Sequence, residues 1–173
     1  MLAIDTSTQW CSVAIHHDHG GTSVPPFLLI RHEELGALAS GVVLDWVAEL
    51  AQQANIDLLD LEQIAVGIGP GAFTGIRIGV GVAQGLALAL NKDCCGISCL
   101  DVVAYEAIQQ LGLGIGSSLL VAVDARMNEV YCGNYRVGRD GYPELGDAIE
   151  LMSPDEVRSP VEFYYLVGNA VIA

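Results

Sequence analysis

Two short apolar runs near the start of the chain, Leu2-Ala-Ile-Asp5 and Cys11-Ser-Val-Ala-Ile15, decide the fold. Apolar runs joined by a few polar residues are typical of a β-hairpin. The same arrangement returns in the second half as Leu119-Leu-Val-Ala-Val-Asp124 and Val130-Tyr-Cys-Gly-Asn-Tyr135. In both copies an aspartate ends the first run. The repeat predicts two related lobes built on one duplicated architecture.

The hydrophobic spacing between and after the hairpins predicts alternating strands and helices. After a loop at 16–21, strands are expected at 27–30, 64–68 and 94–97. Helices are expected at 33–53, 74–90 and 100–111, the last of them capped by Ser98. The second hairpin is followed by an expected strand at 148–151, a brief helix opened by Ser153 and a strand at 163–167. The first half therefore has the α/β order βββαβαβα.

A glycine-rich stretch at 112–118 predicts the boundary between the two lobes. The first lobe then covers residues 1–112 and the second covers residues 113–173. Because a second full βββαβαβα set needs many more residues than 113–173 provides, the second lobe is expected to be incomplete at its carboxyl end.

The composition indicates a chain that does not exist alone. Hydrophobic residues make up 52% of its 173 residues and charged residues only 16%, whereas charged residues are roughly a quarter of a typical domain. The net charge of −14 leaves no basic field to hold a nucleic acid unaided. The longest apolar stretch, 76–90, is interrupted by Arg77 and Gln84 and is too short for a membrane span. No signal peptide is expected, so the cytoplasm is the predicted location.

The densest motif runs from Gly67 to Gly85, where a strand, a glycine loop and a helix follow one another. Such a loop can cradle phosphate, but it lacks the Lys-Ser or Lys-Thr of a P-loop and the dinucleotide fingerprint. The alternative is close packing of the helix, whose small residues fall on two faces. They are Gly75, Gly79 and Ala83 on one face and Gly81, Gly85 and Ala89 on the other. The chain's own sheet accounts for one close neighbour and a partner helix for the second, unless both faces serve the chain's own core.

Asp5 and Asp124 resemble the carboxylates that actin-like and sugar-kinase-like ATPases aim at magnesium and phosphate from two lobes. Those hairpins place glycine just after the aspartate so that phosphate can approach the backbone. Here Thr6 and Ser7 follow Asp5, and alanine and arginine follow Asp124. Asp5, Thr6, Ser7 and Asp124 are thus candidate nucleotide-binding residues. The alternative is that both aspartates only cap their hairpin turns.

No catalytic or metal-binding set is predicted. The five cysteines include no Cys-x-x-Cys pair and are interpreted as reduced core residues. The four histidines include no pair spaced by four, and three of them are expected in one exposed loop at 16–19. Serines are plentiful, but the sequence contains no Gly-x-Ser-x-Gly elbow.

Three stretches together resemble the TsaB family within the glycoprotease-like group. They are Ile4-Asp-Thr-Ser7 with Cys11-Ser-Val13, Gly69-Pro-Gly-Ala-Phe-Thr-Gly-Ile-Arg-Ile-Gly79 with Gln84-Gly-Leu86, and Asp124-Ala-Arg-Met-Asn-Glu-Val-Tyr131. The block Gly-Pro-Gly-x-Phe-Thr-Gly-x-Arg is the specific part, whereas the Asp-Thr-Ser hairpin is shared by many relatives. The resemblance runs to about Gly168 and implies an actin-like fold with two lobes, in a chain shorter than the family's usual length.

The resemblance also implies a function. TsaB is a non-catalytic subunit that works with TsaD and TsaE to threonylcarbamoylate adenosine 37 in tRNAs reading codons that start with A. It pairs with TsaD, or with a second copy of itself when alone, through the first-lobe helices, and it reaches tRNA only through the complex. ATP or ADP with magnesium is a candidate cofactor at the partner interface, and no membrane is involved. The implied interface residues are Leu38, Val42, Trp46, Gly75, Gly79 and Val82.

Overall fold

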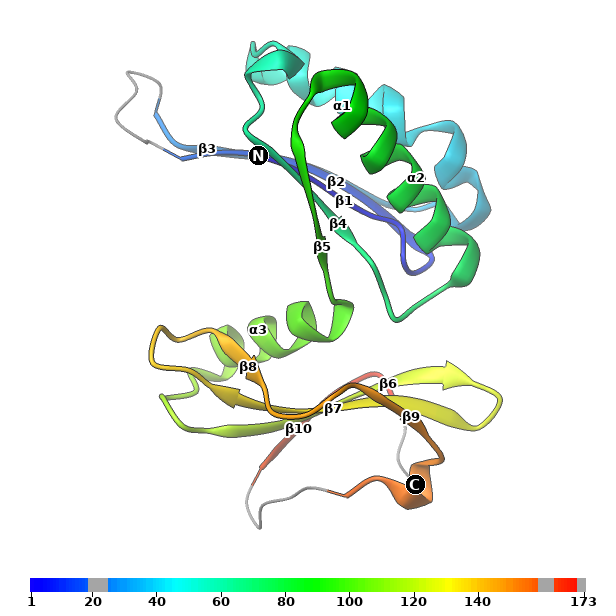
Figure 1. The fold of residues 1–173 in the computed structure, drawn as a ribbon, viewed down its shortest axis with the longest axis vertical. Coiled ribbons are helices and arrows are strands. Elements are labelled where there is room, and N and C mark those ends of the chain that lie inside the picture. The colour runs from blue at the N-terminus through cyan, green and yellow to red at the C-terminus, as the bar shows by residue number, and fades with distance from the viewer. Residues whose placement is uncertain (19–24, 159–163, 171–173) are drawn as a thin grey trace. The chain divides into compact units, whose positions relative to one another are not determined.

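A computed structural model describes residues 1–18, 25–158 and 164–170 of the chain. The chain divides into two compact units, Met1–Ile97 and Ser98–Ala173. Each unit is built around its own five-stranded sheet (Figure 1). The two units are described separately below.

The first unit contains a mixed sheet with the strand order β3-β2-β1-β4-β5. The antiparallel strands β1, β2 and β3 span Leu2–Asp5, Trp10–His17 and Phe27–Glu34. The parallel strands β4 and β5 span Gln63–Gly67 and Asp93–Ile97. The first hairpin therefore forms as the sequence predicts. On its other edge β1 pairs in parallel with β4.

Two helices cover one face of this sheet (Figure 1). Helix α1 spans Val43–Ala54 and α2 spans Phe73–Leu90, while the short 3₁₀ helices η1 and η2 span Gly36–Gly41 and Leu58–Asp60. Because α2 connects the parallel strands β4 and β5, it is the crossover that such a pair requires. Both ends of α2 are thus fixed to the same sheet.

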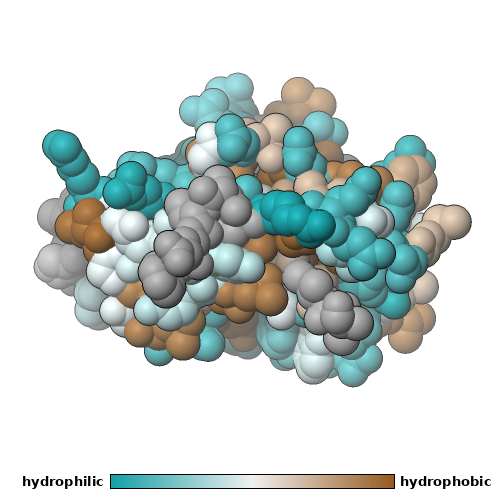
Figure 2. Space-filling view, turned by 90° about the horizontal axis from the view of Figure 1, so that it is seen from below, coloured by the Kyte–Doolittle hydropathy of each residue, from teal (hydrophilic) through white to brown (hydrophobic). Residues whose placement is uncertain are grey.

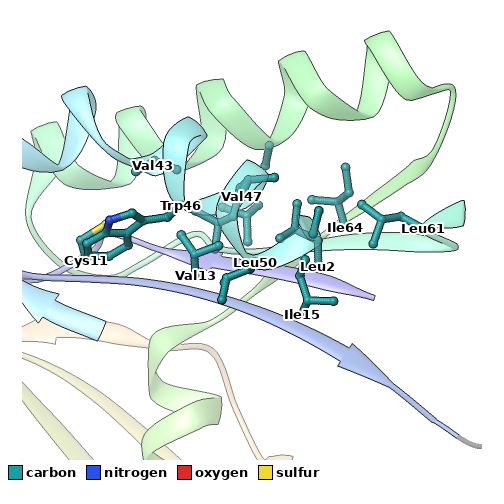
Figure 3. Close-up of a cluster of buried hydrophobic side chains, with 14 of the residues drawn as sticks. Leu2, Cys11, Val13, Ile15, Val43, Trp46, Val47, Leu50, Leu61 and Ile64 are labelled. Carbon is teal, nitrogen blue, oxygen red and sulfur yellow. The ribbon is translucent and has the colours of Figure 1, made fainter. Parts of the chain in front are cut away.

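The core of the first unit lies between the sheet and the helices α1 and α2. Alternate residues of β2 are buried, as expected for a strand with one covered face. Figure 3 shows their side chains directed toward those of α1 and of the neighbouring strands. The labelled members are Leu2, Cys11, Val13, Ile15, Val43, Trp46, Val47, Leu50, Leu61 and Ile64.

The second unit begins with helix α3, Cys99–Leu111, whose amino terminus is capped by the Ser98 side chain as predicted. Strands β6, β7, β8, β9 and β10 follow at Ser118–Arg126, Glu129–Val137, Pro143–Leu145, Glu150–Met152 and Tyr165–Gly168. The 3₁₀ helix η3, Pro154–Glu156, lies between β9 and β10 and carries a capping box from Ser153. The sheet order is β10-β6-β7-β8, and β9 also pairs with β7.

The two sheets repeat one connection pattern. In the first unit, β1 pairs antiparallel with β2 and parallel with β4. In the second unit, β6 pairs antiparallel with β7 and parallel with β10. The repeat of the hairpin pattern in the sequence therefore corresponds to a repeat in topology, and the predicted α/β class is confirmed.

The division between the units differs from the predicted boundary at residue 112. Helix α3 belongs to the second unit because its apolar face, Leu100, Ala104 and Ile108, packs against Leu119 and Val121 of β6. The break therefore falls between Ile97 and Ser98. The glycines at 112–118 form only the connection from α3 to β6.

Two predictions were wrong in detail, and one strand was missed. The helix expected at 33–53 forms only in part, because β3 continues to Glu34, the 3₁₀ helix η1 starts at the left-handed Gly36, and α1 starts only at Val43. The loop expected from His16 starts later, since His16 and His17 end β2, while residues 19–21 lie outside the described residues. Strand β8 carries too few residues to produce an alternating pattern and was not predicted.

Tyr135 holds α3 to the sheet of the second unit. Its side chain is 3% exposed, and its hydroxyl donates a hydrogen bond of 2.7 Å to Asp101 Oδ1. Burial, together with the hydrogen bond to Asp101 and its negative charge, raises the pKa of Tyr135 well above the usual range. The neutral hydroxyl is therefore the form that the fold stabilises.

We expect Tyr135 to lower the free energy of unfolding at alkaline pH. Below the ordinary tyrosine pKa of about 10, the side chain is neutral in both the folded and unfolded chain and adds no pH dependence. Above it the unfolded chain loses this proton first, so the free energy of unfolding falls by about 1.4 kcal/mol per pH unit. Denaturant titrations at several alkaline pH values should show a shallower decline in Tyr135→Phe, but not in the exposed control Tyr142→Phe. The same slope in all three chains would contradict this assignment.

Candidate partner-binding surface and the aspartate turns

The turn that follows β1 is built from three polar residues that satisfy one another and the backbone. Ser7 donates its backbone N–H to Asp5 Oδ1 at 2.7 Å, which closes a turn typical of aspartate. Thr6 and Ser7 are both buried, at 2% and 1% exposure. Asp5 thus caps its own hairpin turn, which agrees with the interpretation of the aspartates as turn caps.

This turn lies directly against the amino-terminal half of α2. The Thr6 hydroxyl donates a hydrogen bond of 2.7 Å to the carbonyl oxygen of Gly75, and the backbone N–H of Ala72 donates one of 2.5 Å to the carbonyl oxygen of Ser7. A β-carbon at Gly75 would overlap the Thr6 carbonyl, and one at Gly79 would lie 2.7 Å from Thr6 Oγ1. The glycines are therefore required by the approach of the turn.

The turn after β1 also lies against the glycine loop that precedes α2. A β-carbon on Gly71 would overlap the carbonyl oxygen of Ser7, and one on Gly67 would lie 2.7 Å from Asp5 Oδ1. The turn after β1 therefore fills the space beside these glycines. Of the two sequence interpretations of the loop, phosphate cradle or close packing, these contacts support packing.

The two small-residue faces of α2 have different surroundings. Gly79, Ala83 and Ala87 are its buried residues and face the chain's own sheet. Gly81 and Gly85 are exposed, and a β-carbon at either position would meet nothing within 4 Å. One face is thus used within the chain, and the second is open to a neighbour.

The six implied interface residues fall into three groups. Leu38 on η1 is 71% exposed, while Val42 and Val82 are half-buried. Trp46 is only 5% exposed and belongs to the core. Gly75 and Gly79 contact Thr6, so a partner helix cannot occupy the space beside them. The open surface therefore lies on a different face of α2 from these two glycines.

We name this open surface the α2 strip. It consists of the exposed α2 residues Phe73, Arg77, Gly81, Gln84, Gly85 and Leu88. Spacings of three and four residues place them along one side of the helix. Phe73 and Leu88 are 68% and 85% exposed, and Leu38 and Leu44 are large exposed apolar residues on the neighbouring η1 and α1. Exposed apolar residues gathered in this way mark interaction surfaces.

Exposure of apolar side chains alone does not single out the α2 strip. The second unit also exposes large apolar residues, including Tyr142, Leu151, Tyr165 and Leu166. Figure 2 shows hydrophobic residues in several separate patches among hydrophilic ones on the face that it presents. What distinguishes the α2 strip is its two glycines, which allow a backbone to approach closely.

By length and composition, α2 would also suffice to cross a membrane. The apolar stretch 76–90 is too short for a span, but the helix is longer because it begins at Phe73. In the fold, α2 is a crossover between parallel strands, and the Thr6 hydroxyl binds its Gly75. A helix held to a sheet in this way favours a protein neighbour over lipid.

Asp124 repeats the turn chemistry of Asp5 in the second unit. Arg126 donates its backbone N–H to Asp124 Oδ1 at 2.8 Å, and its guanidinium lies 3.6 Å from Asp124 Oδ2. The backbone N–H of Asp124 donates to Asn169 Oδ1 at 3.0 Å. Sequence reasoning missed Asn169, for which the only signal is its position just after β10. Asp5 and Asp124 belong to different units.

The cysteines and histidines have mostly structural surroundings. Cys11 and Cys132 are buried, and burial raises the pKa of both thiols. Cys94 is exposed on β5, so the interpretation of every cysteine as a core residue was wrong there. His32 stacks on Trp10 with ring centroids 4.7 Å apart, and its Nδ1 lies 2.7 Å from Ser12 Oγ. Within the part of the chain that the structure describes, no three His, Cys, Asp or Glu side chains gather as a metal site would require.

The duplicated hairpin pattern defines an α/β protein of two related units. The family model of TsaD, tRNA N6-adenosine threonylcarbamoyltransferase, matches residues 14–152. The tRNA threonylcarbamoyladenosine biosynthesis protein TsaB of Escherichia coli K12 is 35% identical over 162 residues, which are 94% of this chain and 66% of that protein. The same-named protein of Haemophilus influenzae is 35% identical over 131 residues, covering 76% of this chain and 51% of its own length.

Among solved structures, YeaZ from Pseudomonas aeruginosa is 36% identical with a TM-score of 0.82, covering 96% of this chain and 74% of that one. The chain belongs to the TsaD family, as a TsaB (YeaZ) type member. It spans between half and two thirds of the length of the E. coli and H. influenzae relatives.

Alanine substitutions at two glycines of α2 should separate the two faces of this helix. Gly79→Ala should lower the free energy of unfolding by about 1–3 kcal/mol, because the added methyl group overlaps the Thr6 hydroxyl. Gly85→Ala should raise it by up to about 1 kcal/mol, because alanine stabilises an exposed helix position. Denaturant unfolding measures both values. Equal midpoints for the two variants would refute the assignment of Gly79 to internal packing.

Proposed function

We propose that this chain is a non-catalytic scaffold that binds and activates TsaD in tRNA threonylcarbamoyladenosine synthesis. With TsaD and TsaE it would support threonylcarbamoylation of adenosine 37 in tRNAs that read codons starting with A. The observation that carries the proposal is the open α2 strip in a chain related to TsaB. The role in partner binding rests on the family resemblance, and the strip supplies the surface.

The physical basis of the proposed contact is close helix packing. Gly81 and Gly85 leave the backbone of α2 uncovered, so a partner helix can approach without steric cost. Burial of Phe73, Leu88 and Leu38 would then remove large apolar surface from water, at about 25 cal/mol per Å². Glycines within a helix cost up to about 1 kcal/mol each relative to alanine, and a close partner offsets this cost.

The proposed division of labour places catalysis in the partner. The resemblance implies that the partner TsaD carries metal-binding histidines spaced by four. The four histidines of this chain show no such spacing. Its net charge of −14 would oppose direct binding of a phosphate backbone. The partner would therefore hold the tRNA, in the cytoplasm where tRNA modification takes place.

A bulky residue in the middle of the α2 strip should weaken binding to TsaD without unfolding the chain. Gly85→Leu places a side chain where a β-carbon meets nothing within 4 Å. It would hold a partner helix away, and we expect the dissociation constant for TsaD to rise about tenfold or more. Titration calorimetry measures binding, and nucleoside mass spectrometry measures threonylcarbamoyladenosine in a reconstituted reaction containing TsaE.

The matched control for this experiment is Gly114→Leu. Gly114 lies in the second unit, is exposed and also has nothing within 4 Å of a β-carbon. This variant should bind TsaD and support modification as the unaltered chain does. Full modification activity of Gly85→Leu, or of a reaction that lacks this chain altogether, would contradict the scaffold proposal.

The same strip would form a homodimer when TsaD is absent. A two-fold pairing of α2 strips buries the same apolar residues and needs no other partner. Light scattering of the isolated chain should then give a dimer mass for the unaltered protein and a monomer mass for Gly85→Leu. Addition of TsaD should convert the homodimer into a heterodimer, since both states use one surface.

The alternative function, an actin-like ATPase that uses Asp5 and Asp124, has less support from the turn after β1. There the side chains of Thr6 and Ser7 are buried against α2, where glycine would leave room for phosphate. Saturable binding of magnesium ATP by the isolated chain, lost in Asp5→Ala, would favour the alternative. Binding of ATP or ADP only in the presence of TsaD would instead indicate a nucleotide site at the partner interface.

A further inference from the structure

Arg77 is the one charged residue in the eighteen residues of α2. It is exposed, and its guanidinium carbon lies 3.8 Å from the centroid of the Phe73 ring one turn earlier. A guanidinium over an aromatic face is attracted by the ring and loses some of its freedom. Arg77 is therefore a partly ordered cation on the α2 strip.

The helix dipole disfavours the charge of Arg77. The amino-terminal end of a helix carries a partial positive charge, which favours acidic residues and disfavours cations. Helices α1 and α3 follow this rule with Asp45 and Asp101 in their first turns, whereas α2 has no acidic residue there. The helix dipole therefore does not explain the cation of α2.

The described residues provide no carboxylate for Arg77, although the sequence holds 21 acidic against 7 basic residues. The ion pairs found in ranges 1–18, 25–158 and 164–170 use Arg31 and Arg126. Arg77 takes part in none of these. In a chain this acidic, a basic side chain left without an acidic neighbour is available to an outside anion.

The neighbours of Arg77 along the helix determine which kind of anion can reach it. Phe73 and Gly81 lie one turn to either side, and Leu88 lies further along the α2 strip. A partner that covers this strip would remove the guanidinium from water, and a buried unpaired charge is costly. The covering surface must therefore supply an acceptor opposite Arg77.

We propose that Arg77, positioned by Phe73, binds the carboxylate of an aspartate or glutamate on the protein that covers the α2 strip. The proposal rests on the scaffold function proposed above and specifies the chemistry of that partner. A carboxylate can accept two parallel hydrogen bonds from the guanidinium. An RNA phosphate is disfavoured by the apolar neighbours and by the net charge of −14. The contact would fix the register of the partner along the otherwise featureless strip.

The test measures TsaD binding by titration calorimetry at low and high salt for a set of Arg77 variants. Arg77→Gln should raise the dissociation constant about tenfold or more, because it removes a charged hydrogen-bonding partner. Arg77→Lys should bind with intermediate affinity, because it keeps the charge but loses the planar pair of donors. The salt dependence of binding should be weaker in Arg77→Gln than in the unaltered chain.

The matched control is Arg139→Gln, which makes the same change of charge at an exposed site of the second unit. It should bind TsaD within about twofold of the unaltered chain. Thermal unfolding of each variant checks that the fold is kept. On the partner side, lysine substitutions at exposed acidic residues of TsaD are combined with Arg77→Glu, and one of them should restore binding and so identify the carboxylate.

The outcomes separate this inference from the proposed function. If the unaltered chain does not bind TsaD, both are overturned. If the unaltered chain binds TsaD and Arg77→Gln binds equally well, the carboxylate contact is wrong and the scaffold function stands. If Arg77→Gln keeps TsaD binding but weakens binding of tRNA by the complex, the anion is an RNA phosphate and the inference is overturned in favour of that source.

Discussion

The contact between Thr6 and α2 is the constraint on which the first unit depends. The hydroxyl of Thr6 binds the Gly75 carbonyl, and the Thr6 side chain fills the space beside Gly79. Because the turn after β1 approaches the helix backbone so closely, only glycine fits at these helix positions. This contact fixes α2 against the sheet in one orientation. It also decides which face of the helix is used up inside the chain and which remains open.

The open face has the properties of a surface that awaits a neighbour. It combines exposed Phe73 and Leu88 with glycines that no side chain of the unit covers. A helix that served only its own core would need just one small-residue face. The second face carries the stability cost of glycine without a contact inside the chain that offsets it. The proposed function and the proposed role of Arg77 both follow from this asymmetry.

Much of the fold could be predicted from local patterns. The hairpins, α2, α3 and the Ser98 cap follow from alternation, helical period and side-chain capping, which are properties of neighbouring residues. The break between η1 and α1 was missed because the apolar period runs through it, whereas the backbone of Val42, with φ −123° and ψ −20°, departs from the helix there. The placement of α3 in the second unit depends on what its apolar face meets, which periodicity cannot reveal.

The sequence by itself determined the duplicated hairpins, the acidic and apolar character of the chain and the presence of two small-residue faces on one helix. Only the tertiary structure decided how those faces are used. Gly75 and Gly79 were expected at a partner interface, yet they face Thr6 of the same chain, which lies some seventy positions earlier. A spacing pattern shows that a helix has a smooth face but not what lies against it, because that depends on residues that only the fold brings together.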